Sequence, residues 1–305
     1  MATSNPTIYA TDEYLDLAVK KFDRLLAPLT TFTYMPLQGT QIAKSTVSVG
    51  LVQNQLSASI FTGTYEVSST TDEVDQVAVN LQHAHKAFFW PQLGADINPL
   101  AVIESTLHTN AQGLGNFVFQ LACAPIVSGS VSASIFTSAN GFRNAISGST
   151  NTNFDLSAVK TVAKTLASQS ALVSECNLII PQDYGVNVIP TSNAFGTYVG
   201  SAFTDGVISG YMGMNYFPVT YPVDASGTVK GFGAHQTAAV CITGIPPCPG
   251  MDQYLRYEII ELPTLKGCKV AYREWVQLGT GAHYGDFELL IGSAAANTDG
   301  AVIIY

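Results

Sequence analysis

Two strand-forming stretches on either side of a polar tip place the strongest constraint on how this chain folds. Residues 41–56 are rich in Val, Ser and Thr, and residues 76–88 alternate between two faces, as half-buried strands do. Between them, residues 62–75 are polar and contain turn formers. The pattern predicts a long β-hairpin with few apolar pairs near its tip. Because such a hairpin is marginal alone, we expect it to lie on a neighbouring surface.

The chain also carries little charge for its size. Only 11% of its 305 residues are Asp, Glu, Lys or Arg, whereas about 25% is usual in soluble domains, and 47% are apolar. A folded chain of this length leaves about a quarter of its surface exposed, and here that surface must include many uncharged and apolar atoms. We interpret it as a surface that identical copies of the chain cover.

Hydropathy and charge argue against two classes of protein. The longest uncharged stretches, residues 105–142 and 184–204, are broken by polar residues and Gly, so neither is expected to span a membrane. The net charge is −9, and the only basic cluster is Lys20, Lys21 and Arg24 on one predicted helix. Sequence-specific nucleic-acid recognition is therefore not expected. A solvated helix face is the simpler explanation of these cations, and a face turned toward nucleic acid is the alternative.

The cysteines and the first residues favour folding in a reducing cytoplasm. The cysteines are odd in number, widely spaced and without a C-x-x-C motif, which argues against a disulfide framework and a zinc ribbon. They are Cys123, Cys176, Cys241, Cys248 and Cys268. Residues 1–6 are polar and lack the basic start and apolar stretch of a secretory signal.

Three helices follow from periodicity and capping residues. After an extended arm over residues 1–10, Thr11 caps a helix that reaches Leu26. Asn98-Pro99 begins a second helix that runs to Ala122. A third covers residues 155–174, with Asn153 or Asp155 as its cap. Glycines at positions 113 and 115 weaken the second helix unless another element packs closely there.

The rest of the chain is rich in strands, so the fold class is mixed α+β. Short Val- and Ile-rich segments are separated by Gly and Pro. The expected strands are residues 178–181, 186–189, 207–214, 219–223, 238–243, 254–262, 270–278, 287–291 and 301–305.

This order of elements, together with several short segments, resembles the major capsid (coat) proteins of tailed bacteriophages, whose Hong Kong 97-like fold is shared with encapsulin shells. The segments follow the third helix in order. They are Asn177–Gly185 (NLIIPQDYG), Gly206–Tyr211 (GVISGY), Asn215–Val219 (NYFPV), Gly231–Ala239 (GFGAHQTAA) and His283–Phe287 (HYGDF).

The resemblance covers nearly the whole chain and implies an organisation into four parts. They are an N-terminal arm (1–40), an extended loop (41–86), a peripheral domain (87–125 with 266–305, including a spine helix at 98–122) and an axial domain (126–265). It further implies assembly into pentamers and hexamers that close an icosahedral shell around double-stranded DNA. A portal, packaged DNA bound non-specifically, and a virion assembled in the host bacterial cytoplasm belong to the same expectation.

Two departures from the family narrow this expectation. Some relatives join their subunits by an isopeptide bond from a loop Lys, but no Lys or Arg occurs between Ser45 and His85 here. Covalent cross-linking of that kind is therefore not expected. Some relatives also begin with a long cleaved scaffolding segment, whereas the arm here starts a few residues after Met1, so a scaffold would be a separate protein.

Candidate chemical groups have simpler structural explanations. His83 and His85 lie on one face of a predicted strand and could bind Zn²⁺ or Cu²⁺ with a third ligand. Paired histidines on a half-buried strand are usually structural, so no metal, cofactor or catalytic residue is assigned. The acids of the loop tip and two aromatic residues are instead candidates for contacts between subunits. These candidates are Phe61, Tyr65, Asp72, Glu73 and Asp75.

The sequence therefore predicts a non-enzymatic, self-assembling shell protein. The nearest alternative is a cellular compartment shell of the encapsulin type. The alternative from another class is an α+β enzyme with a Cys/His or metal site, but the chain has no G-x-S-x-G motif and its cysteines lie among apolar neighbours.

Overall fold

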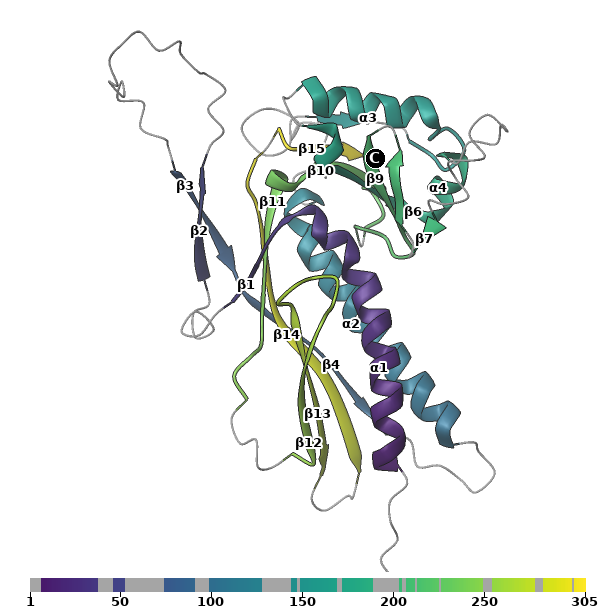
Figure 1. Cartoon of the computed structure of the whole chain (residues 1–305), viewed down its shortest axis with the longest axis vertical. Helices are drawn as coiled ribbons and strands as arrows, with labels where there is room; N and C mark the ends of the chain where they lie inside the picture. Colours follow the sequence, from purple (N-terminus) through teal and green to yellow (C-terminus); the bar gives the residue numbers. More distant parts are fainter. Residues whose placement is uncertain are drawn as a thin grey trace, which may run out of the picture.

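The described structure contains two large sheets placed one above the other along the molecule, with helices against both, and a separate two-stranded sheet (Figure 1). It is a computed structural model that describes residues 7–37, 46–52, 74–90, 99–127, 144–146, 149–168, 172–188, 203–204, 207–211, 213–224, 226–248, 254–277, 282–297 and 299–305. The helices are α1 (Thr7–Leu26), α2 (Pro99–Val127), α3 (Leu156–Ser168) and α4 (Gln182–Val188). None of the helices in these ranges is long and apolar enough to cross a membrane.

The first sheet, here called sheet I, is organised around the long strand β14. This strand pairs antiparallel with β4, β11 and β13, while β12 and β1 extend the sheet on either side. Only β1 runs parallel to its neighbour, β11. The strands are β1 (Thr33–Pro36), β4 (Gln82–Phe89), β11 (Ala239–Gly244), β12 (Arg256–Glu261), β13 (Lys269–Val276) and β14 (His283–Ala295).

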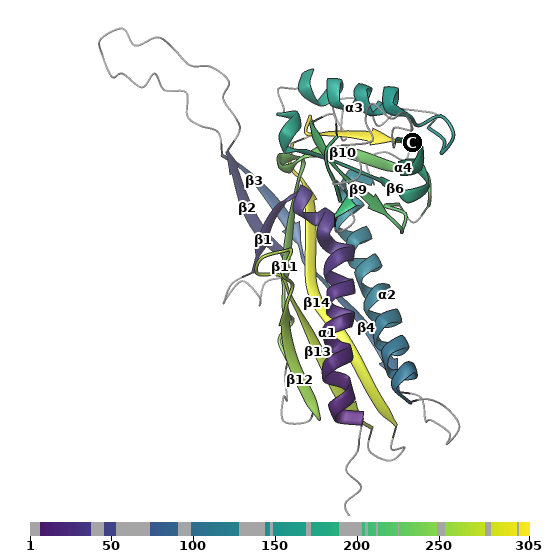
Figure 2. The same cartoon turned by 45° about the vertical axis from the view of Figure 1, so that its right-hand side comes forward.

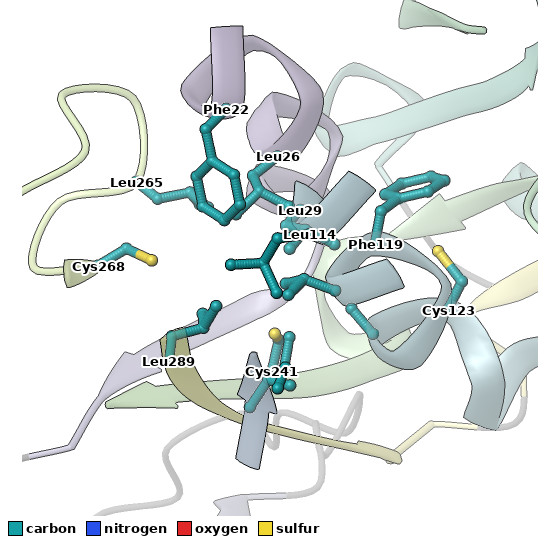
Figure 3. Packing of buried hydrophobic residues seen from close by; sticks show 14 of the residues in the cluster. Phe22, Leu26, Leu29, Leu114, Phe119, Cys123, Cys241, Leu265, Cys268 and Leu289 are labelled. Atoms are coloured by element: carbon teal, nitrogen blue, oxygen red, sulfur yellow. The ribbon is translucent and has the colours of Figure 1, made fainter. Parts of the chain in front are cut away.

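The largest hydrophobic core lies between one face of sheet I and the helix pair α1–α2. Along β14, alternate residues such as Phe287 and Leu289 point into this core, because side chains on a strand alternate between its faces. Figure 3 shows Phe22 and Leu26 of α1 close to Leu114 of α2 within it. Burial of many such side chains, at about 25 cal/mol per Å² of apolar area, is the main stabilisation of this half of the molecule.

Helix α1 packs closely against α2 at Gly115. The sequence predicts such a contact, because a glycine inside a helix costs stability unless another element packs closely there. A Cβ atom at this position would lie 2.9 Å from Leu25 Cδ1 and 3.2 Å from Phe22 Cδ2 on α1. Gly113 differs, because a Cβ atom there would meet only the Lys86 side chain at 3.8 Å. Gly115 is therefore a position at which side chains of α1 pack directly against α2.

The second sheet, sheet II, has seven strands and contacts helices on one face and the main core on the other. Leu178 and Ile180 of its central strand pack with α3 and α4, whereas Ile179 points into the main core. Phe232 stacks on Phe32 at a centroid distance of 6.0 Å, which joins this sheet to the segment between α1 and β1. The strands are β5 (Asn144–Ile146), β6 (Cys176–Pro181), β7 (Phe203–Thr204), β8 (Val207–Tyr211), β9 (Met214–Val219), β10 (Gly231–His235) and β15 (Ala301–Ile304).

The predicted hairpin exists, but its second strand is shorter than expected. The expected strand at 76–88 is two strands, β3 (Val74–Asn80) and β4, separated at Leu81. The burial pattern explains the break: Val79 is buried in β3, whereas Ala84 and Phe88 are buried in β4, so the buried face changes parity. Strand β3 pairs with β2 (Thr46–Val52), and β4 joins sheet I.

Helix α1 begins earlier than predicted, at Thr7 rather than at a Thr11 cap. Residues 7–10 contain neither Gly nor Pro, so no helix-breaking residue prevents the helix from beginning before Thr11. Helix α2 likewise continues through Pro125 to Val127 rather than ending at Ala122.

Helix α3 is shorter than the predicted helix at 155–174, and the structure shows which of the two candidate residues caps it. Asp155 is the capping residue, because its Oδ1 accepts hydrogen bonds from the backbone N–H groups of Ser157 (2.8 Å) and Ala158 (3.2 Å). The helix ends at Ser168, and Leu172 is exposed beyond it.

Two predicted strands are wrong. The expected strand at 186–189 is instead the end of α4, in which Tyr184 and Val188 lie one helical turn apart and are both buried. The expected strand at 219–223 is a turn after β9, where Asp224 accepts backbone hydrogen bonds from Ser226, Thr228 and Val229.

The predicted division into peripheral and axial parts remains a prediction, and the strands do not follow its boundaries. Strands β11 and β12 fall within 126–265 but belong to sheet I. Strand β15 falls within 266–305 but belongs to sheet II.

Candidate interaction surfaces

The base of the β2–β3 hairpin is anchored on the face of sheet I that the helices leave free. Val47, Val49 and Val79 form a small buried cluster with Val240 and Ile242 of β11. Both views place β2 and β3 on the opposite side of sheet I from α1 and α2 (Figures 1 and 2). The expectation that the hairpin needs a neighbouring surface is thus met at its base by the chain itself.

Most of the predicted contact residues of the loop lie outside the described residues. These are Phe61, Tyr65, Asp72 and Glu73. Asp75 lies on β3, where its Cα pairs with Leu51, but its side chain is not described. Their role in contacts between subunits remains a prediction.

The same free face of sheet I carries a row of aromatic rings at the end distant from sheet II. The row has four rings, in the order Phe89, Tyr284, Trp275 and Tyr254. The centroids of successive rings lie 6.1, 5.6 and 6.3 Å apart. The Phe89 side chain is 51% exposed, and Leu255 and Ile259 beside this end of the sheet are 66% and 50% exposed. Exposed aromatic and aliphatic side chains grouped on one sheet face are typical of a contact surface.

Sequence patterns did not reveal this aromatic row. Three members lie on β4, β13 and β14, the fourth lies two residues before β12, and no local spacing connects them. The register of the four strands brings them together, so the only available signal was the presence of aromatics on alternate positions of predicted strands.

His83 and His85 lie on one face of β4, as predicted, and each faces a carboxylate of β14. His83 Nε2 lies 3.0 Å from Glu288 Oε2, and His85 Nδ1 lies 3.6 Å from Asp286 Oδ2. Arg273 of β13 forms an ion pair with the other oxygen of Glu288. The carboxylate of Glu288 is buried, so these contacts join three strands through one charged group.

This arrangement supports a structural role for both histidines. Burial is the main cause that lowers the pKa of His83, and the same cause raises the pKa of Asp286. Within the described ranges, no group of three or more His, Cys, Asp or Glu side chains converges as a metal site would require.

The predicted basic cluster lines a cavity of about 740 Å³ between α1, α2 and the end of β9. Lys20, Lys21 and Arg24 come from α1, and His108 comes from α2, with its Nδ1 3.5 Å from Lys21 Nζ. Burial and the neighbouring Lys21 lower the pKa of His108. The described lining contains no Asp or Glu. We call this cavity the basic groove.

The walls and floor of the basic groove are mostly apolar. Its apolar lining residues include Leu17, Leu25, Phe119, Phe217, Val219 and Tyr221. A smaller cavity of about 380 Å³ shares Lys20 and Arg24 with it and includes Asp23. That carboxylate is already occupied, because it accepts hydrogen bonds from the Thr264 backbone N–H (3.0 Å) and hydroxyl (2.6 Å).

The cysteines offer little nucleophilic chemistry. Cys123, Cys176, Cys241 and Cys268 are buried, and Cys248 is half-buried. Burial raises the pKa of Cys123, Cys241 and Cys268, and it raises that of Cys176 to about 11. A raised thiol pKa disfavours the reactive thiolate.

Comparisons with known proteins identify the fold. No protein-family profile and no curated protein sequence matches the chain. Among solved structures, a virus-like particle from Pyrococcus furiosus matches with a TM-score of 0.55 and 13% identity, over 96% of this chain and 98% of that one. The capsid of cyanophage P-SCSP1u matches with a TM-score of 0.54 and 11% identity, over 90% and 86%. The capsid of a native GTA particle matches with a TM-score of 0.51 and 9% identity, over 92% of this chain and 89% of that one.

These matches confirm the predicted α+β fold class, and the chain has the Hong Kong 97-like fold. They cover 90–96% of this chain and 86–98% of the matched chains. At such low identities, the shared property is the fold.

Proposed function

We propose that the chain is the non-enzymatic structural subunit of a closed icosahedral shell, assembled from pentamers and hexamers of identical copies. The observation that carries this proposal is the full-length match to shell-forming proteins, which includes a cyanophage capsid and a virus-like particle. Folds host many functions, so the surfaces of this chain must support the same conclusion.

The surfaces do support it. A subunit with a charge content of 11% can bring many identical copies together with little mutual repulsion. The aromatic row and the exposed Leu255 and Ile259 leave apolar area on sheet I that a neighbour would cover. The hairpin, anchored only at its base in the described structure, provides a projecting element for contact with another copy.

The contents of the shell follow from the same proposal. The resemblance to tailed-phage coat proteins favours a virion that encloses double-stranded DNA, with a portal and a separate scaffolding protein, assembled in the cytoplasm of a bacterial host. Acidity does not oppose this, because the DNA would be driven in and its phosphates neutralised by counterions. The match to the Pyrococcus furiosus particle favours a second candidate, a cellular compartment shell.

Electron microscopy of the purified recombinant chain tests the shell itself. We expect closed particles of uniform size. A chain that stays monomeric at high concentration and converts a small molecule would instead support an enzyme. Particles isolated from the native source separate the two kinds of shell: nuclease-protected double-stranded DNA supports a virion, and an enclosed protein without DNA supports a compartment.

Deletion of residues 62–75 tests the role of the hairpin tip. We expect soluble monomers or rings and no closed particles, because a projecting contact between copies is lost. Circular dichroism would check that the shortened chain is folded, since the base of the hairpin keeps its own buried cluster. Normal shells from this variant would contradict the proposed contact.

A third experiment tests how the shell is held together. The chain has no Lys between Ser45 and His85, so the tip of the loop has no side-chain amine for an isopeptide bond. We expect shells boiled in detergent to run as single chains on a denaturing gel, and a ladder of covalent multimers would refute this.

A further inference from the structure

One buried polar side chain of the basic groove lacks a hydrogen-bond partner in the described part of the chain. Asn116 follows Gly115 on α2, is 7% exposed and lines the groove. Its side-chain amide forms no hydrogen bond with any residue that the structure describes. Leaving a buried amide unpaired is costly, and native proteins pair nearly all such groups. The amide therefore indicates a ligand that presents a donor and an acceptor side by side.

The same groove gathers positive charge. Lys20, Lys21 and Arg24 lie on one face of α1, because Arg24 is four and three residues beyond the two lysines. Burial lowers the pKa of His108, which favours the neutral imidazole, and its Nδ1 lies 3.5 Å from the Lys21 ammonium. The described lining contains no carboxylate that would neutralise these cations. Cations beside apolar walls fit an anionic group such as a phosphate.

The rest of the lining is mostly apolar and includes aromatic rings. Phe119 of α2 and Phe217 of β9 are buried beside the cavity, whereas Tyr221 after β9 and Leu17 of α1 are each 41% exposed. The helices that form the groove lie side by side in both views (Figures 1 and 2). The volume of about 740 Å³ lies within the range of about 300–1,000 Å³ that is usual for small-molecule sites.

We propose that the basic groove binds a nucleotide. The base lies against the aromatic lining and pairs through its edge with the Asn116 amide, and the phosphate binds the three cations of α1. Every nucleobase has a donor beside an acceptor on its edge, and one amide can match both. An acyl chain would fill the apolar floor but leave the amide unpaired. The proposal goes beyond the shell function and does not depend on it.

A free nucleoside phosphate and an unpaired nucleic-acid strand both offer this chemistry. Stacking of a base on an aromatic side chain tolerates any sequence, and the phosphates of a strand contact cations in the same way as a free phosphate. A duplex does not offer it, because its bases are stacked and paired and only its phosphates would reach the groove. The two sources differ in the affinity that the neighbouring nucleotides add.

Calorimetric titration of the purified chain at neutral pH and low salt tests the proposal. Subunits are first separated from particles by gel filtration, so that both faces of the chain are accessible. We expect deoxyadenosine monophosphate to bind at least about tenfold more tightly than inorganic phosphate, and a short single strand to bind at least about tenfold more tightly than its duplex. A single strand that also exceeds the mononucleotide by more than about tenfold identifies nucleic acid as the source, and equal binding identifies the free nucleotide.

Asn116→Leu tests the amide, because it keeps the size of the side chain and removes only its polar atoms. We expect the affinity for the mononucleotide to fall at least about fivefold and that for inorganic phosphate to stay the same. The urea midpoint should stay the same or rise, because no described hydrogen bond is lost. Tyr221→Ala changes an exposed ring, so its folding is safe, and we expect it to lose about fivefold in mononucleotide affinity.

A rim variant replaces the three cations of α1 by Gln. We expect it to weaken both the mononucleotide and inorganic phosphate by at least about tenfold, because both bind through phosphate oxygens. A matched control removes three positive charges from exposed residues outside the groove and should keep both affinities. Its substitutions to Gln are at Lys160, Lys164 and Lys266.

Each remaining outcome overturns the proposal. A mononucleotide that binds no more tightly than inorganic phosphate shows that no base is recognised, and equal binding of duplex and single strand shows the same. An oligoglutamate peptide that binds as tightly as the mononucleotide makes the groove a site for acidic peptides instead. Unchanged mononucleotide affinity in Asn116→Leu removes the amide from the site. A chain that binds the nucleotide but forms no particles contradicts only the shell function.

Discussion

Gly115 on α2 and Leu25 on α1 are in contact so close that a Cβ atom on the glycine would lie 2.9 Å from Leu25 Cδ1. The same atom would lie 3.3 Å from Leu25 Cβ, which cannot move without the helix backbone. Leu25 also lines the basic groove, so the spacing of the two helices sets the shape of that groove. Substitutions at this glycine therefore test both the packing of the core and the geometry of the groove.

Gly115→Ala should destabilise the chain, although alanine favours a helix by about 1 kcal/mol over glycine. Overpacking of a close contact costs about 1–3 kcal/mol, so we expect a net loss of up to about 2 kcal/mol. The urea midpoint of unfolding measures it.

Gly113→Ala is the matched control, because it lies on the same helix and its new Cβ would make only an ordinary contact at 3.8 Å. We expect it to stabilise the chain by up to about 1 kcal/mol through helix propensity. Equal effects of the two substitutions would show that α1 does not approach α2 at Gly115.

Gly185→Ala should be strongly destabilising, because a Cβ atom on this residue of α4 would overlap the hydroxyl of Tyr216 on β9. Removal of that hydroxyl relieves only the closest contact, because the Cβ atom would still lie 2.8 Å from Tyr216 Cζ. We expect Gly185→Ala to lose more than about 2 kcal/mol, and Gly185→Ala with Tyr216→Phe to recover only part of it.

Tyr216→Phe alone is the reference for that pair. Within the described residues, the buried Tyr216 hydroxyl has no hydrogen-bond partner, so its removal should be neutral or slightly stabilising. A loss of stability in Tyr216→Phe would mean that the hydroxyl has a partner, and a double variant no better than Gly185→Ala would rule out the overlap.

Asp23→Ala should detach the end of α1 from the loop before β13. The buried carboxylate accepts two hydrogen bonds from Thr264, and its loss leaves a backbone N–H without a partner. We expect a cost of about 1–3 kcal/mol in thermal or urea unfolding. Thr264→Val, which removes only the hydroxyl contact, should cost less, and the opposite order would contradict the hydrogen-bond geometry.

Thiol labelling should distinguish one cysteine from the others. Cys248 is half-buried, whereas the remaining four are buried, and the pKa of Cys176 is raised to about 11 by burial and by the adjacent Glu175. At pH 8 a thiol of that pKa is about 0.1% thiolate, so its labelling is slow. We expect Cys248 to react first with a maleimide and the others only after unfolding, as read by mass spectrometry of peptides.

The sequence predicts the helices and strands of this fold better than it predicts which strands pair with each other. Asn98-Pro99 fixes the start of α2, and the apolar spacing of Val159, Val162 and Leu166 fixes the buried face of α3. Both are local signals, which a single sequence contains. The parity change at Leu81 is also local, yet it acquires meaning only because β4 pairs with β14, some 200 residues later in the chain.

The interaction surfaces depend even more on tertiary structure. The sequence singles out Lys20, Lys21 and Arg24 as a cluster, but only the packing of α1 beside α2 adds His108 and the apolar floor from β9. The sequence shows that His83 and His85 form a pair on one strand face. It does not show that they face Glu288 and Asp286, because that depends on the register between β4 and β14. Charge composition suggests that surfaces are shared between copies, but it does not locate them.

Strand β14 has a mechanical consequence for any assembly built from this chain. It pairs with β4 over eight residues, from Phe89 opposite Tyr284 to Gln82 opposite Ile291, and β4 leads directly into the hairpin. Tension applied through the hairpin runs lengthwise along these two strands, so their ladder is loaded in shear and its bonds resist together rather than unzipping one by one. A force transmitted from a neighbouring copy therefore acts on β4 and β14 inside sheet I and not on the edge strands of that sheet.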